Sequence, residues 1–176
     1  GHWGTRPKLL EQRLASDSAF FCELIRLAFC SRDDEGEKKE PTEQEQRVAH
    51  QAYRLLHEWQ TPPGTLAEGG FCADAFHEWL AAVRTSCEET GHLEVALSQL
   101  GEALIHAPAD PRGLWIDESV ASALNARDSE EMRSGFRTGI YNSRGAHCVD
   151  PTGKPEKELA AKYRAQADDA ETTGFH

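Results

Sequence analysis

Apolar residues recur with the period of an α-helix in two neighbouring stretches near the middle of the chain, residues 76–87 and 93–107. Each stretch carries one apolar stripe with spacings of three and four residues: Phe76, Leu80, Val83 and Cys87, then Leu93, Ala96, Leu97, Leu100 and Leu104. Gly91 lies between the stripes, and glycine is common where a helix ends. The pattern predicts two helices that fold back on each other as an αα-hairpin.

Helical periodicity continues on both sides of this pair. The further helices that we expect cover residues 9–14, 20–29, 42–59, 113–127, 129–141 and 156–172. No segment alternates apolar and polar residues as a strand does. The sequence therefore predicts an all-α chain of about seven antiparallel helices. Two architectures stay open: an irregular helical bundle, or a degenerate α-solenoid of the HEAT or tetratricopeptide (TPR) kind.

Local signals mark several helix boundaries and contacts. Asp17 and Ser18 are alternative candidate caps for the second helix. Thr42 and Glu45 have the spacing of a capping box, which fixes the start of the next helix. Gly135 and Gly139 lie four residues apart inside an expected helix, where glycine costs about 1 kcal/mol relative to alanine. We therefore expect another helix to approach them closely.

The helix over residues 20–29 is apolar around most of its circumference. Such a helix is buried on most sides, or it contacts something outside the domain.

At 176 residues, the chain has the size of one domain. Two segments lack helical periodicity. Residues 31–41 contain five acidic and three basic residues and read as a charged mobile loop, and residues 142–155 form a long polar loop. At the end of the chain, residues 173–176 resemble a turn followed by the start of another helix. We therefore expect residues 1–176 to be a single domain within a longer protein.

Composition excludes some classes of function. The net charge is −11, whereas a protein that grips nucleic-acid phosphates needs a basic surface. No apolar run approaches the roughly 18 residues of a membrane helix.

The chain contains five cysteines, and no two of them form a C-x-x-C pair: Cys22, Cys30, Cys72, Cys87 and Cys148. This set favours neither a disulfide framework nor a zinc site and indicates a reducing, cytoplasmic compartment, with Cys22 and Cys87 as small core residues.

Residues 105–168 have a distinctive sequence. It contains IHAPADPRGLW and ALNARDSEEMRSGFRTGIYNSRGAHCVDPTGKPEKELAAKYR. This sequence resembles the C-terminal helical portions of large, uncharacterised bacterial proteins. The resemblance covers about two fifths of the chain and implies a bacterial source and a tail position. It implies no catalytic motif and no substrate.

The most suggestive polar cluster lies in the long loop. It combines an imidazole, a carboxylate and cations, which are groups that acid–base chemistry and binding use. The candidate binding residues are Asn142, Arg144, His147, Asp150 and Lys154. Polar loops with an Asp-Pro-Thr-Gly run are also ordinary turns, so we favour a structural loop over a binding surface, and binding over catalysis. No catalytic residue is predicted.

The histidines give a weak metal signal. His106 stands at an expected helix C-terminus, where capping of free carbonyls is the more common role. His50 and His57 are seven residues apart and could share a helix face, but zinc needs further ligands. The sequence also lacks a P-loop, a dinucleotide fingerprint and a G-x-S-x-G elbow. We predict neither a metal nor a cofactor.

The leading functional hypothesis is a non-catalytic interaction or scaffold domain of a larger bacterial protein. It would present a helix face or a groove to another protein or to the remainder of its own chain, and it would bind neither nucleic acid nor membrane. One alternative is a small-molecule or enzymatic site on the 142–154 loop. Another is an acidic regulator that mimics nucleic acid. A wide apolar patch favours interaction, a deep polar pocket favours the enzyme, and an acidic stripe favours mimicry.

Overall fold

The computed structural model describes residues 8–30, 40–143 and 153–175. All regular structure in that part of the chain is α-helical, and Thr65 and Phe71 form only an isolated bridge. The helices are α1 (Lys8–Ser16), α2 (Ser18–Ala28), α3 (Glu43–His57), α4 (Ala73–Glu89), α5 (Leu93–Leu104), α6 (Glu118–Asn125), α7 (Glu130–Ser143) and α8 (Lys154–Thr172). The all-α prediction is confirmed, with eight helices among the described residues instead of about seven.

The local boundary signals act as expected at α2 and α3. The Asp17 carboxylate accepts a hydrogen bond from the backbone N–H of Phe20 at 3.2 Å. The Thr42 hydroxyl accepts from the N–H of Glu45 at 3.2 Å, and the Glu45 carboxylate accepts from the N–H of Thr42 at 2.7 Å. This reciprocal pair is the predicted capping box, and it satisfies two N–H groups that a helix start leaves free.

Helix α4 ends at the predicted glycine. Gly91 has a positive φ of 71°, and the N–H of His92 donates to the carbonyl of Cys87 at 2.8 Å. This is a Schellman motif, in which glycine adopts the left-handed conformation without a Cβ clash. The chain then enters α5, which contacts α4 but packs most extensively on α7. The stripes of α4 and α5 therefore face a larger shared core instead of only each other.

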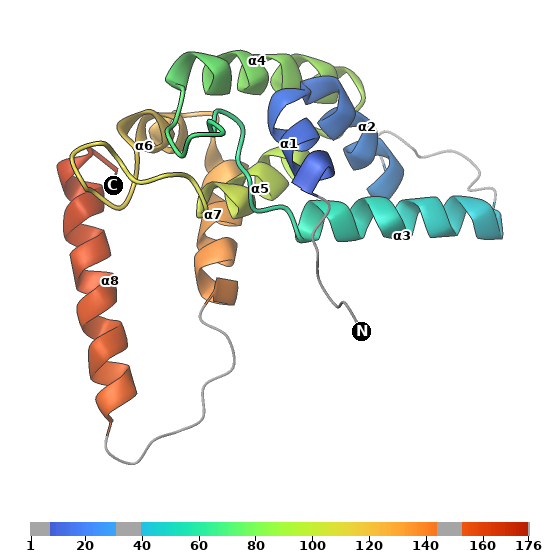
Figure 1. Cartoon of the computed structure of the whole chain (residues 1–176). Coiled ribbons are helices and arrows are strands. Elements are labelled where there is room, and N and C mark those ends of the chain that lie inside the picture. The colour runs from blue at the N-terminus through green and yellow to red at the C-terminus, as the bar shows by residue number, and fades with distance from the viewer. Residues whose placement is uncertain (1–7, 31–39, 144–152, 176) are drawn as a thin grey trace.

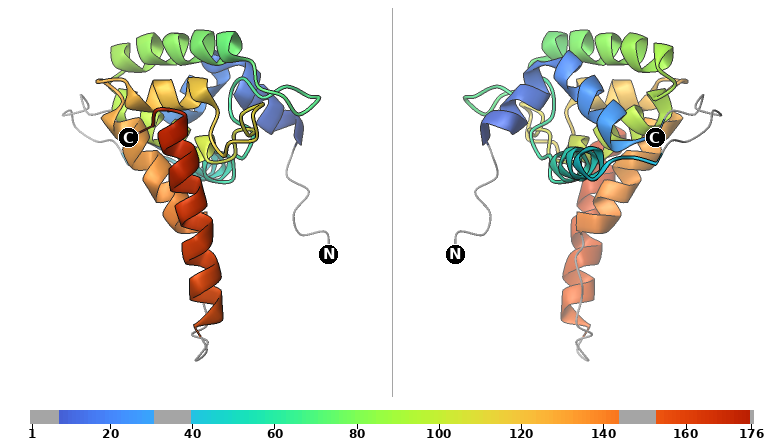
Figure 2. Two further views of the ribbon diagram at one scale, coloured as in Figure 1. Left: turned by 90° about the vertical axis from the view of Figure 1, so that its left-hand side faces the viewer. Right: turned by 90° about the vertical axis from the view of Figure 1, so that its right-hand side faces the viewer.

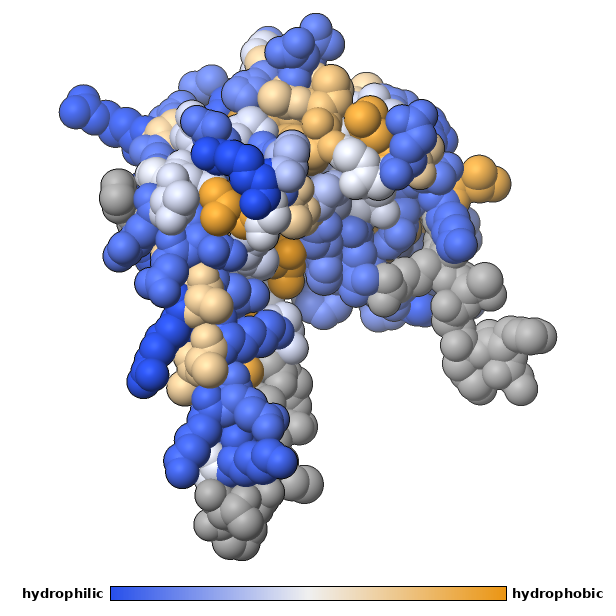
Figure 3. All heavy atoms as spheres, turned by 60° about the vertical axis from the view of Figure 1, so that its left-hand side comes forward, coloured by the Kyte–Doolittle hydropathy of each residue, from blue (hydrophilic) through white to orange (hydrophobic). Residues whose placement is uncertain are grey.

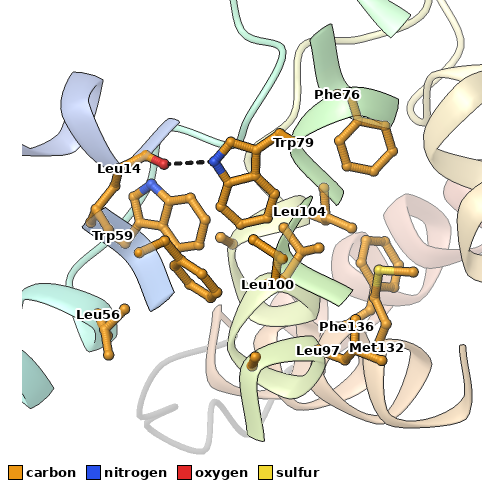
Figure 4. Packing of buried hydrophobic residues seen from close by; sticks show 14 of the residues in the cluster. Leu14, Leu56, Trp59, Phe76, Trp79, Leu97, Leu100, Leu104, Met132 and Phe136 are labelled. Atoms are coloured by element: carbon orange, nitrogen blue, oxygen red, sulfur yellow. Dashed lines mark hydrogen bonds between the residues drawn. The ribbon is translucent and has the colours of Figure 1, made fainter. Parts of the chain in front are cut away.

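Helix α5 lies near the centre of the molecule and contacts α2, α4 and α7 (Figures 1 and 2). Its buried residues are Ala96, Leu97, Leu100, Gly101, Ala103 and Leu104. Met132 and Phe136 of α7 are buried on one side of α5, and Trp79 of α4 lies on the other (Figure 4). The arrangement is consistent with an irregular helical bundle.

A cluster of aromatic rings joins the N-terminal helices to the core. Phe21 of α2 lies 5.4 Å from Trp59 and 4.8 Å from Trp79, measured between ring centroids. The indole N–H of Trp79 donates to the carbonyl of Leu14 at 3.0 Å, which holds the end of α1 on α4 (Figure 4). Trp79 is buried, whereas Trp115 is half-buried at the edge of the core.

The predicted helix over residues 113–127 is corrected by the structure: α6 begins only at Glu118. Gly113 has a positive φ of 83°, which is incompatible with a right-handed helix. The buried Asp110 carboxylate organises this segment, because it accepts hydrogen bonds from the backbone N–H and the guanidinium of Arg112, both at 2.9 Å. Residues 110–117 therefore form an ordered loop with Ile116 in the core.

Helix α8 is attached mainly by its C-terminal end. Phe175 packs edge-on against Phe136 with centroids 5.9 Å apart, and the Asp169 carboxylate accepts from the N–H of Trp115 at 3.0 Å. The rest of α8 projects from the body (Figure 1), and its surface on the side shown in Figure 3 is mostly hydrophilic. Phe175 therefore closes a helix end, whereas the sequence suggested that it begins another helix.

None of the described helices is long and apolar enough to cross a membrane. The expected charged loop at residues 31–41 lies, except for its last two residues, outside the described part of the chain.

Candidate functional site

The structure places two of the five loop residues that the sequence singled out. Asn142 is exposed in the last turn of α7, and Lys154 is the exposed first residue of α8. Arg144, His147 and Asp150 lie outside the described residues. The binding surface on this loop therefore stays a prediction.

Asn142 also borders a polar pocket of about 470 Å³. The pocket lies where the C-terminal ends of α3, α5 and α7 meet, and it brings together three residues that are far apart in the sequence: His57, His106 and Asn142. The lining also includes four apolar side chains: Leu56, Trp59, Ala103 and Ile105. Helix C-termini carry partial negative charge, so three of them around one pocket favour a cation.

Glu102 is the most chemically distinctive residue of this pocket. Its side chain is half-buried, and no hydrogen bond or ion pair to its carboxylate is found among the described residues. Burial raises the pKa of Glu102, and the nearby His57 acts in the opposite direction. Glu102 could therefore pair with a positively charged group that enters the pocket.

A metal site is not formed by these side chains. No group of three or more His, Cys, Asp or Glu side chains in the described part of the chain could hold a metal ion. His50 and His57 are both exposed on α3, and His106 is exposed just after α5. The two imidazoles contribute polar lining to the pocket, and the ring of His57 also stacks on that of Tyr53 with centroids 5.9 Å apart.

The second candidate site is an apolar groove of about 410 Å³ between α1, α2 and α3. These helices lie on the side of the molecule away from α8 (Figure 2, right). Apolar lining residues come from all three: Leu10, Phe20, Leu24, Leu27, Val48, Ala52 and Leu55. The polar lining residues are Gln51 and Arg54 on α3 and its C-cap residue Glu58. We call this feature the α1–α2–α3 groove.

The spacing of the lining residues gives the groove its shape. Those on α2 recur at i, i+4 and i+7. Those on α3 and its C-cap extend from Val48 to Glu58, which is ten residue steps along the helix. At 1.5 Å per residue, the wall on α3 is about 15 Å long. Two helical ridges of this kind form the type of surface into which another helix packs.

The exposure of these side chains distinguishes the groove from the core. Leu27 is 42% exposed and Leu10 is 37% exposed, whereas Leu24 and Ala52 at the bottom are buried. Arg13 covers one rim with its guanidinium 4.1 Å from the ring centroid of Phe20. Arg54 and Glu58 form an ion pair of 3.4 Å on the other rim. The groove thus has an apolar floor between polar edges, as interaction sites do.

The sequence indicated one wall of this groove but not the site. The apolar circumference of residues 20–29 showed that α2 has more apolar surface than one core face uses. The structure buries Phe21, Cys22 and Ile25 on the core side and leaves Phe20 and Leu27 at the groove. The contributions of α1 and α3 depend on tertiary packing and have no separate signal in the sequence.

Compared with known proteins, the chain matches no family model, no curated protein and no solved structure. The groove and the pocket are therefore the features of the molecule that bear on its function. The resemblance over residues 105–168 stays an expectation.

Proposed function

We propose that this chain is a non-catalytic helical interaction domain and that it binds an amphipathic helix of another protein in the α1–α2–α3 groove. The observation that carries the proposal is the open apolar groove of about 410 Å³, in which Leu27 and Leu10 remain exposed. Burying such side chains in an interface releases roughly 25 cal/mol per Å² of apolar area.

The shape of the groove favours a helix as the occupant. Its two walls are helical ridges, and an amphipathic helix of about three turns matches the length of the α3 wall. The net charge of −11 favours a partner whose polar face is basic, because the long-range field attracts it. A basic amphipathic helix is therefore the partner that the overall charge attracts.

Binding of designed peptides tests this proposal. The probe is a fluorescein-labelled helical peptide of leucine and lysine with all leucines on one face. Its control has the same composition in a scrambled order that distributes leucine around the helix. Fluorescence anisotropy should show saturable binding of the first peptide and at least tenfold weaker binding of the second.

A pair of matched variants locates the binding site. Leu27→Asp places a charge in the groove and should weaken binding of the amphipathic peptide at least tenfold. Leu66→Asp is the control, because Leu66 lies outside the groove and is 43% exposed, close to the 42% of Leu27. This variant should bind the amphipathic peptide as the wild type does. Equal affinity for both peptides, or equal loss in both variants, would overturn the proposal.

The polar pocket supports a second candidate function, the binding of a small organic cation. The half-buried Glu102 carboxylate and three helix C-termini favour positive charge there, and Ile105 and Trp59 offer apolar contact. Benzylamine and benzoate are suitable probes of similar size and opposite charge. Only benzylamine should shift the amide resonances of Glu102 and His106, and Glu102→Gln should abolish the shifts while Glu94→Gln on the same helix retains them. Equal shifts with both probes would argue against this function.

Two further parts of the proposal rest on the sequence. The resemblance over residues 105–168 supports membership in a larger bacterial protein. The scattered cysteines support a reducing, cytoplasmic location. Mimicry of nucleic acid has less support, because the exposed acidic residues of α4 are confined to its two ends, with Ala81, Ala82 and Thr85 exposed between them.

A further inference from the structure

Two cysteines that are 65 positions apart meet inside the fold. Cys22 lies on α2 and Cys87 in the last turn of α4, and their sulfur atoms are 3.5 Å apart. The Cys87 thiol donates a hydrogen bond to the Cys22 sulfur. Both residues are free thiols, and both are buried, with 2% and 1% exposure. A disulfide requires these sulfurs to approach from 3.5 Å to a bond length of about 2.05 Å.

The surroundings of the pair distinguish Cys22 from Cys87. The hydrogen bond from Cys87 lowers the pKa of Cys22 to about 7, with help from a hydrogen bond of Ser86 and the charge of Arg26. The same contact raises the pKa of Cys87, because that thiol keeps its proton to donate. Cys22 is therefore the thiol that ionises first. Arg26 is exposed and Ser86 half-buried, so the pair lies just below the surface.

We propose that Cys22 and Cys87 form an oxidation site, at which a hydroperoxide converts the two thiols into a disulfide between α2 and α4. The Cys22 thiolate attacks one oxygen of hydrogen peroxide, the O–O bond breaks, and the departing hydroxide takes up a proton to give water. Cys22 is then a sulfenic acid. The Cys87 sulfur attacks the Cys22 sulfur and displaces hydroxide, which takes the Cys87 proton and leaves as a second water. Two thiols are oxidised and one peroxide is reduced.

The disulfide would cross-link α2 and α4, which are joined covalently at present only through the intervening chain. It would close a loop that contains all of α3, so it restricts the unfolded chain strongly. The other described cysteines lack this arrangement: Cys30 is exposed and Cys72 is half-buried, and neither contacts a described cysteine. The site is independent of the proposed helix-binding function, because Cys22 faces α4 on the side of α2 away from the groove.

The experiment treats the purified chain with a small excess of hydrogen peroxide and maps the products by mass spectrometry after digestion. The expected product is one Cys22–Cys87 disulfide, with two fewer titratable thiols and the mass of two hydrogens lost. The melting temperature should rise by on the order of 10 °C, and dithiothreitol should reverse the rise.

Variants separate this site from oxidation elsewhere. Cys30→Ser and Cys72→Ser should retain the disulfide and the rise in melting temperature, whereas Cys87→Ala should lose both. If Cys87→Ala does not fold, the disulfide assignment by mass spectrometry of the oxidised wild-type chain tests the proposal by itself. A disulfide that involves Cys30, Cys72 or Cys148 instead, a Cys22 that is oxidised further without a bond to Cys87, or unchanged thiols would each overturn the proposal.

Discussion

Gly135 of α7 lies directly against the backbone of Ser98 on α5. A Cβ atom at Gly135 would stand 2.0 Å from the Ser98 carbonyl oxygen, a distance that no real Cβ contact shows. The reverse contact is equally close, because a Cβ at Gly101 of α5 would lie 2.1 Å from the carbonyl oxygen of Met132. Glycines on both helices therefore allow α5 and α7 to pack backbone against backbone.

The first prediction concerns Gly135→Ala and Gly101→Ala. Alanine in a helix gains about 1 kcal/mol over glycine, but here the added methyl group meets backbone that cannot move aside locally. Each variant should therefore lose about 1–3 kcal/mol of unfolding free energy, measured by urea denaturation.

Two other glycines provide the comparison. A Cβ at Gly139 would approach Glu102 at 3.0 Å, so Gly139→Ala should lose less than the first two variants. A Cβ at Gly70 would meet only the Leu66 side chain at 3.4 Å, and Gly70→Ala should change stability by less than about 0.5 kcal/mol. Four equal effects would show that the contact between α5 and α7 is looser than described.

The second prediction compares two leucines of the central stripes. Leu100 is fully buried in α5, and Leu100→Ala should cost about 2–5 kcal/mol, through lost burial and the cavity left behind. Leu80 of α4 is only half-buried, and Leu80→Ala should cost less than about 2 kcal/mol. Chemical denaturation of both variants measures the difference, and an equal loss would contradict the burial that separates them.

The sequence was most informative about helix ends that are fixed by residues close together in the chain. The capping box of Thr42 and Glu45 and the helix end at Gly91 could be predicted because their hydrogen bonds span only a few residues. The close approach at Gly135 could also be predicted, since glycine in a helix interior needs a compensating contact. Its counterpart Gly101 was missed, because the sequence does not show which helix α7 packs against.

Long-range polar contacts escaped prediction for the same reason. The buried Glu11 carboxylate accepts hydrogen bonds from the N–H of Gln60 at 3.1 Å and the hydroxyl of Thr61 at 3.2 Å, about 50 residues away. These two bonds attach α1 to the segment that follows α3 and so support the groove. Periodicity places an acidic residue in α1, but only the tertiary fold supplies its partners.

The candidate sites were predictable only in part. Residues 20–29 had more apolar surface than one core face needs, and this excess became a wall of the α1–α2–α3 groove. The polar pocket unites His57, His106 and Asn142, which the sequence offered separately. Their convergence depends on where three helices end in space, so sequence spacing could not reveal it.

The third prediction concerns the attachment of α8. Phe175 closes a Schellman motif, with its N–H bonded to the carbonyl of Ala170 at 2.8 Å, and packs on Phe136. Phe175→Ala should therefore release the C-terminal half of α8 and accelerate amide hydrogen exchange there. Leu159→Ala, in the projecting half, is the control and should leave exchange around Ala170 unchanged. Equal acceleration in both variants would show that α8 is held along its length.

The last prediction concerns acid and the loop before α6. Hydrogen bonds from the Arg112 side chain, and then from its backbone N–H, hold the pKa of Asp110 down at about 2. A folded-state pKa below the unfolded value of about 3.9 means that the carboxylate stabilises the fold above that value. This stabilisation is lost as the pH falls from about 4 through about 2.

The measurement is the melting temperature of the wild type and of Asp110→Asn across this range. The wild type should melt higher at neutral pH, because the amide has no charge to pair with Arg112 and cannot accept as many hydrogen bonds. The difference between the two melting temperatures should narrow as the pH falls from about 4 to about 2. Protonation then removes the charge of Asp110 in the wild type, as the substitution does in the variant. Asp74→Asn, in the exposed first turn of α4, is the control and should show no comparable gap. Parallel melting curves for Asp110→Asn and the wild type over the whole range would show that the charge of Asp110 does not organise the loop.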